Sequence, residues 1–351
     1  MNNIQVLGKF LDQPILVSKF QKAVPGILAA GAAAYTTNKI IKTPKEKRKN
    51  CAIKTGITLG VTVASAIAAP YIASAITKRP LGDSLDTVKN RNKELIDTFI
   101  KETNLQETTK EILNKGKEKI LSFKEIKRLS EDIKDKNFLE KLIPSPQNVR
   151  AKDIFSEIGY LSVYGAVPVI GGIAGGIAAD KVTDKKNWKE KIPNKIKEGS
   201  YQYLANIFMC NVGAGIALGI LEKLKITSKS ARAAGMTAGI ILTGIIGGSK
   251  IANLIGEKFI DPICYKEKQY KNNEDILDIN FIGKSSSEYI AKNKCKHNHK
   301  CRERKPEVLD IGLHTDDIAT VSLLSGLKWI EPALPIMYTL SGYRAGTGYR
   351  N

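Results

Sequence analysis

Cysteine and histidine gather in one short stretch, "CKHNHKC" at residues 295–301. Cys295, His297, His299 and Cys301 occupy every second position there, and zinc prefers side chains of these types. The spacing is not that of a zinc finger, because in a strand the four side chains would spread over about 20 Å. A tight loop could wrap them around one ion, or pairs could bind separately. The alternative is a polar loop without metal, since the neighbouring lysines and arginine oppose a cation.

A second group of titratable residues precedes the last apolar segment of the chain. Beside membrane helices, His314, Asp316 and Asp317 could form a proton or cation site. The alternative is an ordinary helix start, because Thr315 suits an N-cap and acids suit the first turn. The chain contains no nucleophile elbow, no HExxH motif and no protein-kinase motif set. We therefore predict no catalytic residue, no enzyme activity and no cofactor other than zinc.

Five uncharged segments must position these groups: 23–38, 55–77, 158–179, 199–221 and 233–249. A helix needs roughly 20 residues to cross about 30 Å of hydrocarbon. The second, third and fourth segments reach that length, the fifth is marginal, and the first has 16 residues. Core helices of soluble proteins usually have shorter apolar runs, on the order of 10–14 residues. The segments therefore predict an all-α, multi-pass membrane protein with about four to six apolar segments, against the alternative of a soluble all-α protein.

Glycines recur at four-residue spacing in these segments. In lipid, this spacing gives a helix a face on which a neighbouring backbone can approach closely. In water, each glycine would cost about 1 kcal/mol of helix stability relative to alanine. The stretch "VPVIGGIAGGIAADKV" contains no G-x-G-x-x-G and no Walker lysine, so it is not a phosphate loop. The predicted helix-packing residues are Gly56, Gly60, Gly171, Gly172, Gly175, Gly176, Gly215, Gly219, Gly235, Gly239, Gly244 and Gly248.

The net charge of +20 is concentrated between the apolar segments. Loops 39–54 and 180–198 each contain seven lysines or arginines. Short basic loops stay on the cytoplasmic side of a membrane, which predicts two hairpins with cytoplasmic tips. The linker 222–232 would then lie outside although it contains four basic residues, so it argues against this orientation.

The chain divides into five parts by composition. Residues 1–80 form a first membrane hairpin, 81–150 a soluble unit of amphipathic helices, and 151–260 a second hairpin plus one helix. Residues 261–310 form a polar basic loop with the Cys/His cluster, and 311–351 an apolar segment with a loose, glycine-rich end. "AVPGI" at 23–27 matches "AVPVI" at 166–170, which suggests a repeated hairpin, as in transporter folds. The alternative is a chance match between apolar sequences.

Three functions remain open. The first is an integral protein of a bacterial cytoplasmic membrane that moves a small solute or ion through the bilayer. The second is a membrane scaffold without transport, whose basic loops hold anionic lipid, a membrane protein or a second copy of the chain. The third is a soluble nucleic-acid binder, suggested only by net charge. The first is favoured, although no charged residue lies inside the five segments to act as a relay.

Overall fold

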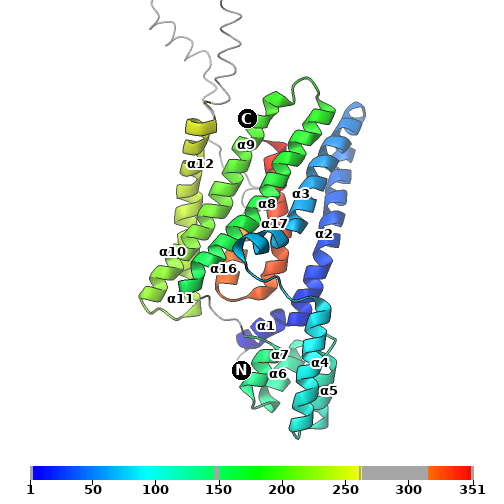
Figure 1. Cartoon of the computed structure of the whole chain (residues 1–351), viewed down its shortest axis with the longest axis vertical. Helices are drawn as coiled ribbons and strands as arrows, with labels where there is room; N and C mark the ends of the chain where they lie inside the picture. The colour runs from blue at the N-terminus through cyan, green and yellow to red at the C-terminus, as the bar shows by residue number, and fades with distance from the viewer. Residues whose placement is uncertain (1–2, 146–148, 150, 261, 263–314, 349–351) are drawn as a thin grey trace, which may run out of the picture.

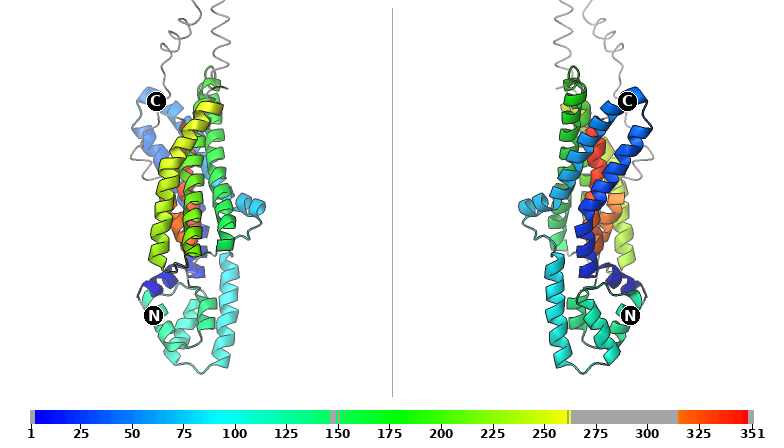
Figure 2. Two further views of the ribbon diagram at one scale, coloured as in Figure 1. Left: turned by 90° about the vertical axis from the view of Figure 1, so that its left-hand side faces the viewer. Right: turned by 90° about the vertical axis from the view of Figure 1, so that its right-hand side faces the viewer.

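The computed structural model describes residues 3–145, 149, 151–260, 262 and 315–348, and every regular element in these ranges is a helix. Figure 1 shows a bundle of long helices with a smaller unit of short helices at one end of it. The side views in Figure 2 show that this unit extends the long axis of the bundle. We call this end the unit end. The opposite end, where the loops before α3 and α9 lie, is called the tip end.

Four helical stretches are long and apolar enough to cross a membrane: Lys45–Thr77, Asp153–Thr183, Lys189–Lys223 and Lys229–Phe259. Each has 31 to 35 residues, more than the roughly 20 that a bilayer requires. The expectation of an all-helical chain with several membrane-length helices is therefore confirmed.

These stretches are built from α-helices interrupted or preceded by short π- and 3₁₀-helical segments. The first contains η1 (Lys45–Lys47) and α3 (Arg48–Thr77), and the second lies in α8 (Ala151–Thr183). The third contains η2 (Lys189–Lys191), α9 (Ile192–Tyr201), η3 (Gln202–Phe208) and α10 (Met209–Lys223). The fourth contains α11 (Lys229–Ile240), η4 (Ile241–Gly248), α12 (Ser249–Ile255) and η5 (Gly256–Ile260).

Two antiparallel pairs of long helices are present in the fold. The first pairs α2 (Pro14–Ile41), which contains the segment 23–38, with α3. The second pairs α8 with the stretch from α9 to α10. Figure 1 shows the turns of both hairpins at the tip end, and the linker between α10 and α11 at the unit end. The two lysine-rich loops therefore share one end of the bundle.

The C-terminal apolar segment forms α16 (Thr315–Leu324), η6 (Lys328–Ala333) and α17 (Leu334–Thr347). α17 packs against α3, α8 and α9, and most of its residues are buried. The expected loose end is therefore not observed over the described part of this segment. Its glycines instead let α17 lie close against α8, as Figure 1 shows in red between the green and blue helices.

Two glycines of α8 contact the backbone of α17. A Cβ atom on Gly172 would overlap the carbonyl oxygen of Gly342 and lie 2.9 Å from its Cα atom. A Cβ atom on Gly176 would do the same at Gly346, 2.8 Å from its Cα atom. Real Cβ atoms do not come this close to backbone atoms, so the observed packing requires glycine at both positions.

Each of these glycines directly follows another one in the sequence. These preceding glycines, Gly171 and Gly175, face a different helix. A Cβ atom on Gly175 would lie 3.1 Å from the carbonyl oxygen of Thr58, and one on Gly171 would overlap the side chain of Ser65. Both partners belong to α3. Adjacent residues on a helix point about 100° apart, so the doubled glycines of α8 give it two close-packed faces.

The predicted glycines outside α8 fall into two groups. Five of them face a neighbouring helix or side chain: Gly215 at Ile158, Gly235 at Leu221, Gly239 at Gly213, Gly244 at Cys210 and Gly248 at Ala205. At Gly56, Gly60 and Gly219 a Cβ atom would meet no described atom within 4 Å. No described helix packs against these three positions, so helix packing there stays a prediction. α3 packs against α8 through a different face, which includes Thr58 and Ser65.

The unit end consists of four short helices around their own apolar core. Leu113, Ile126 and Leu129 are fully buried in it. Ser122 and Glu125 form a capping box at the start of α6, which satisfies two backbone N–H groups. The helices are α4 (Leu85–Glu102), α5 (Glu107–Gly116), α6 (Phe123–Asp132) and α7 (Lys136–Leu142).

A buried lysine of the N-terminal helix α1 (Asn3–Leu11) binds to this unit. Lys9 Nζ lies 2.9 Å from Glu140 Oε1 and donates to the carbonyl oxygen of Ile143 at 2.7 Å. Burial by itself raises the pKa of Glu140. Hydrogen bonds from Ser145 and Lys9 outweigh that effect, so the net pKa lies below its usual value of 4.5.

We expect Glu140→Gln to destabilise the protein near neutral pH and to lose this effect in acid. Because the folded pKa is depressed, the carboxylate contributes its full stability above about pH 4.5, and this is lost as the pH falls through the folded pKa. Thermal unfolding from about pH 7 to pH 3 measures the difference between variant and wild type. Glu118→Gln, an exposed change in the same unit, is the control. A difference that stays constant over this range would contradict the expectation.

Candidate functional site

One face of the stretch from α9 to α10 is polar and buried, although the helix is otherwise apolar. It carries Lys195, Glu198, Gln202, Asn206 and Asn211, each at most 4% exposed. We call these five residues the polar stripe. The first four are three or four residues apart, which places them on one helix face. The last step is five residues, and the π-helical segment η3 absorbs the extra one. The polar stripe extends about 24 Å along the helix.

The tip end of the polar stripe is an ion cluster. Asp180 of α8 is fully buried, with Lys195 Nζ 2.8 Å from its Oδ2 atom and Lys54 Nζ 2.6 Å from its Oδ1 atom. Lys195 also donates to the carbonyl oxygen of Gly346 at 2.7 Å. Lys54 is 40% exposed, so it reaches the cluster from the border of the bundle. Two cations here share one carboxylate.

One turn deeper, a second ion pair joins the polar stripe to α17. Arg344 Nε lies 3.2 Å from Glu198 Oε1, and both side chains are buried. Gln202 Nε2 donates to the same Glu198 oxygen at 2.8 Å, and Asn206 Nδ2 donates to Gln202 Oε1 at 2.8 Å. A continuous hydrogen-bonded chain therefore runs from the guanidinium to Asn206.

At the inner end of the polar stripe, Asn211 Oδ1 accepts a hydrogen bond of 2.8 Å from the hydroxyl of Thr320 in α16. The Asn211 amide nitrogen is buried and has no hydrogen-bond partner in the described part of the chain. The same holds for the hydroxyls of Ser162 in α8 and Ser341 in α17. Such groups are free to hydrogen-bond to water or to a polar solute inside the bundle.

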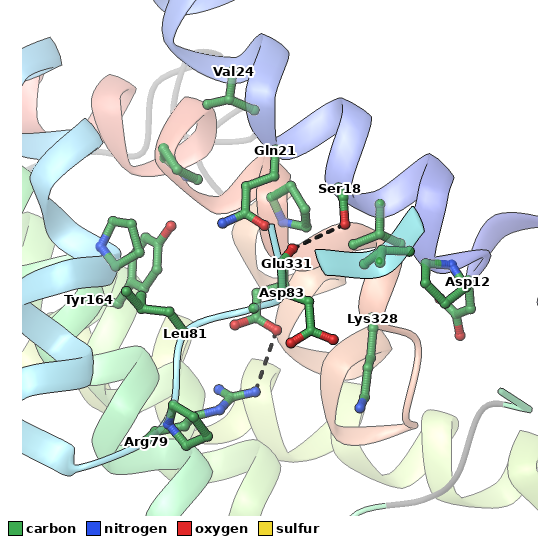
Figure 3. Close-up of a pocket in the computed structure, with 18 of the residues that line it drawn as sticks. Asp12, Ser18, Gln21, Val24, Arg79, Leu81, Asp83, Tyr164, Lys328 and Glu331 are labelled. Atoms are coloured by element: carbon green, nitrogen blue, oxygen red, sulfur yellow. Dashed lines mark hydrogen bonds and ion pairs between the residues drawn. The ribbon is translucent and has the colours of Figure 1, made fainter. Parts of the chain in front are cut away.

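The unit end of the bundle contains a cavity of about 610 Å³. It lies between α2, α3 and η6, and α4 and the loop 78–84 close it on the side of the small unit. Figure 3 shows that its wall combines apolar side chains with several charged ones. Two prolines inside helices, Pro25 of α2 and Pro70 of α3, line it.

Arg79 is the centre of the charges in this cavity. Its guanidinium lies 3.0 Å from Glu157 and 3.4 Å from Glu331, and 4.2 Å from the centre of the Tyr160 ring. The Tyr160 hydroxyl donates to Glu331 Oε1 at 3.3 Å. Lys78 adopts a left-handed conformation (φ 57°) where α3 ends, and so turns the chain toward this cluster.

Asp12 is a second charged group in the wall, and it is 6% exposed. Its Oδ1 atom accepts a hydrogen bond of 2.9 Å from the backbone N–H of Trp329. No described lysine or arginine forms an ion pair with it. Burial raises its pKa above the usual value of 3.8, and the hydrogen bonds from the amides of Trp329 and Lys328 offset only part of that effect.

The candidate metal and proton sites lie partly outside the described residues. The whole Cys/His cluster and His314 lie outside the described residues, so zinc binding stays a prediction. Within the described ranges, no group of three or more histidine, cysteine, aspartate or glutamate residues is arranged to hold a metal ion. α16 begins at Thr315, and Asp317 lies buried in it. A site formed by His314, Asp316 and Asp317 also stays a prediction.

The uncharged segments of the sequence do not reveal the polar stripe. Lys195 and Glu198 precede the segment 199–221 and belong to the predicted basic loop 180–198. Their spacing to Gln202 and Asn206 is helical, and that signal could have placed them on one face of the same helix. Arg344 gave no comparable signal, because it is 146 residues away from its partner.

No model of a known protein family matches this chain, and neither a curated protein nor a solved structure was found that is similar to it.

Proposed function

We propose that the protein is a multi-pass membrane protein that moves a small polar solute or ion, and that the polar stripe lines its path. One observation carries this proposal: buried ionic and amide side chains occupy a continuous face of a helix that is long and apolar enough to cross a membrane. Ionisable groups inside a bilayer are costly, and they are therefore concentrated on solute and proton pathways. The π-helical segment in the stripe supports the same role, since such segments often occur at functional sites.

The charge distribution supports an orientation with the tip end in the cytoplasm. The loops before α3 and α9 both lie there, and they contain most of the lysines that flank the long helices. The linker 224–228 at the unit end is flanked by fewer basic residues. By the positive-inside rule, the balance favours the tip end as the cytoplasmic side, in a bacterial cytoplasmic membrane.

Transport is tested in two steps with the full chain. The protein should remain in membranes after alkaline extraction. Reconstituted vesicles should then show flux of protons or of a solute from a broad panel above that of empty vesicles. We expect Gln202→Leu to reduce this flux at least about tenfold, because the change interrupts the hydrogen-bonded chain without changing charge.

Gln106→Leu is the matched control, since Gln106 is exposed in the small unit and should leave flux unchanged. Wild-type vesicles as tight as empty ones over the whole panel would contradict transport. Equal flux in wild type and Gln202→Leu would show that solute does not use the polar stripe.

The arrangement of the two basic loops favours one alternative function, a scaffold that holds anionic lipid. The loops lie at the same end of the bundle, and their lysines are mostly exposed. Each lysine near an anionic surface contributes about 1 kcal/mol. A scaffold would retain anionic lipid through purification and lose it when Lys45, Lys47, Lys185 and Lys186 are changed to glutamine, with no flux in either form.

A further inference from the structure

We propose that the cavity at the unit end is a binding site for a small organic cation carrying amino or guanidino groups. The cavity of about 610 Å³ is in the ordinary size range for small-molecule sites. Its wall supplies carboxylates, tyrosine rings and apolar surface, and these are the groups that recognise organic cations.

The first argument is that the chain already places a cation in this environment. The Arg79 guanidinium lies against the Tyr160 ring and between the carboxylates of Glu157 and Glu331. Two carboxylates and one ring face thus surround a single guanidinium. Arg79 comes from the loop 78–84, which has no regular secondary structure. A ligand cation would use the same partners and compete with this side chain.

The second argument is independent of Arg79. Asp12 lines the same cavity, is more than nine-tenths buried and forms no ion pair with a described lysine or arginine. Figure 3 shows Asp12 and Arg79 on opposite sides of the cavity. A buried carboxylate without a counter-ion is costly, and a bound cation would remove that cost. The cavity therefore offers acceptors at two places.

The other cations in the wall do not favour an anion. Arg91 lies 2.6 Å from Asp83 and is neutralised by it. Lys328 is exposed and forms no ion pair with a carboxylate in the described part of the chain, although its charge acts on Asp12. If Arg79 moves aside, the carboxylates of Glu331 and Asp12 line the cavity, and Glu157, which is not part of its wall, loses the same cationic partner. Electrostatic complementarity then selects a positively charged ligand.

The binding test of this site is independent of the transport proposal, because binding is measured in detergent without a gradient. Binding without flux would overturn only the transport proposal. Flux without cation binding would overturn only the site.

The test uses the purified full chain and isothermal titration with agmatine, which carries a guanidinium and an ammonium group. We expect saturable binding of agmatine and none of succinate. Arg79→Gln should bind agmatine about tenfold more tightly, because it removes the internal competitor, and Glu331→Gln about tenfold more weakly. Glu190→Gln at the tip end is the matched control and should bind as wild type.

Asp12→Asn is a second variant in case Glu331→Gln does not fold, and it too should weaken agmatine binding. Three results would overturn the proposal. They are tighter binding of succinate than of agmatine, no agmatine binding in either wild type or Arg79→Gln, and unchanged agmatine binding in a folded Glu331→Gln or Asp12→Asn protein.

Discussion

Changing Arg344 to methionine is expected to abolish flux and to lower the free energy of unfolding by about 3–5 kcal/mol. The substitution removes a cationic partner from the buried Glu198 carboxylate, and breaking a buried ion pair by removing one side is strongly destabilising. Thermal and denaturant unfolding in detergent measure the stability, and reconstituted vesicles measure the flux.

A double variant separates the structural from the functional part of this effect. Glu198→Gln combined with Arg344→Met removes both charges and keeps an oxygen that can accept the hydrogen bond from Gln202. Replacing a buried ion pair by neutral side chains is often harmless to stability, so most of the lost stability should return. Flux should not return, because the path has lost the charges of the Glu198–Arg344 pair.

The matched control is an ion pair outside the bundle. Arg128 lies 3.5 Å from Asp132 on the surface of α6, and both side chains are partly exposed. Arg128→Met should cost less than about 1 kcal/mol and leave flux intact. Recovery of flux in the double variant would show that the Glu198–Arg344 pair only stabilises the fold.

Valine in place of Gly172 is expected to separate α17 from α8 and to destabilise the protein by about 3 kcal/mol or more. The Cβ atom would overlap the backbone of Gly342, and two helix backbones cannot yield as a side chain can. α17 also holds Arg344, so the ion pair with Glu198 should be lost in the same variant. Thermal unfolding in detergent and flux in vesicles measure the two effects.

Gly60→Val is the control for this change. Gly60 also lies in a four-residue glycine pattern, but a Cβ atom there meets no described atom within 4 Å. Its stability should stay within about 0.5 kcal/mol of wild type. Equal destabilisation by the two substitutions would mean that contact with α17 does not explain the cost at Gly172.

The sequence alone predicted the helical class, the long apolar helices and the two hairpins, because these follow from local patterns. Helix length depends on the length of an uncharged segment, and four-residue spacing defines one helix face. The unit of short amphipathic helices also follows from local periodicity, as at Ile112 and Leu113.

Only the tertiary structure decided which of those faces are covered. Gly172 and Gly60 have the same local pattern, yet one contacts α17 and the other lies on an open face. By sequence, Lys195 and Glu198 belong to a basic loop, whereas the fold places Asp180 and Arg344 beside them. The cavity likewise joins Asp12, Arg79 and Glu331, which belong to three distant parts of the chain. Helical periodicity determines which residues share a face, whereas the partner of that face depends on the packing of distant segments.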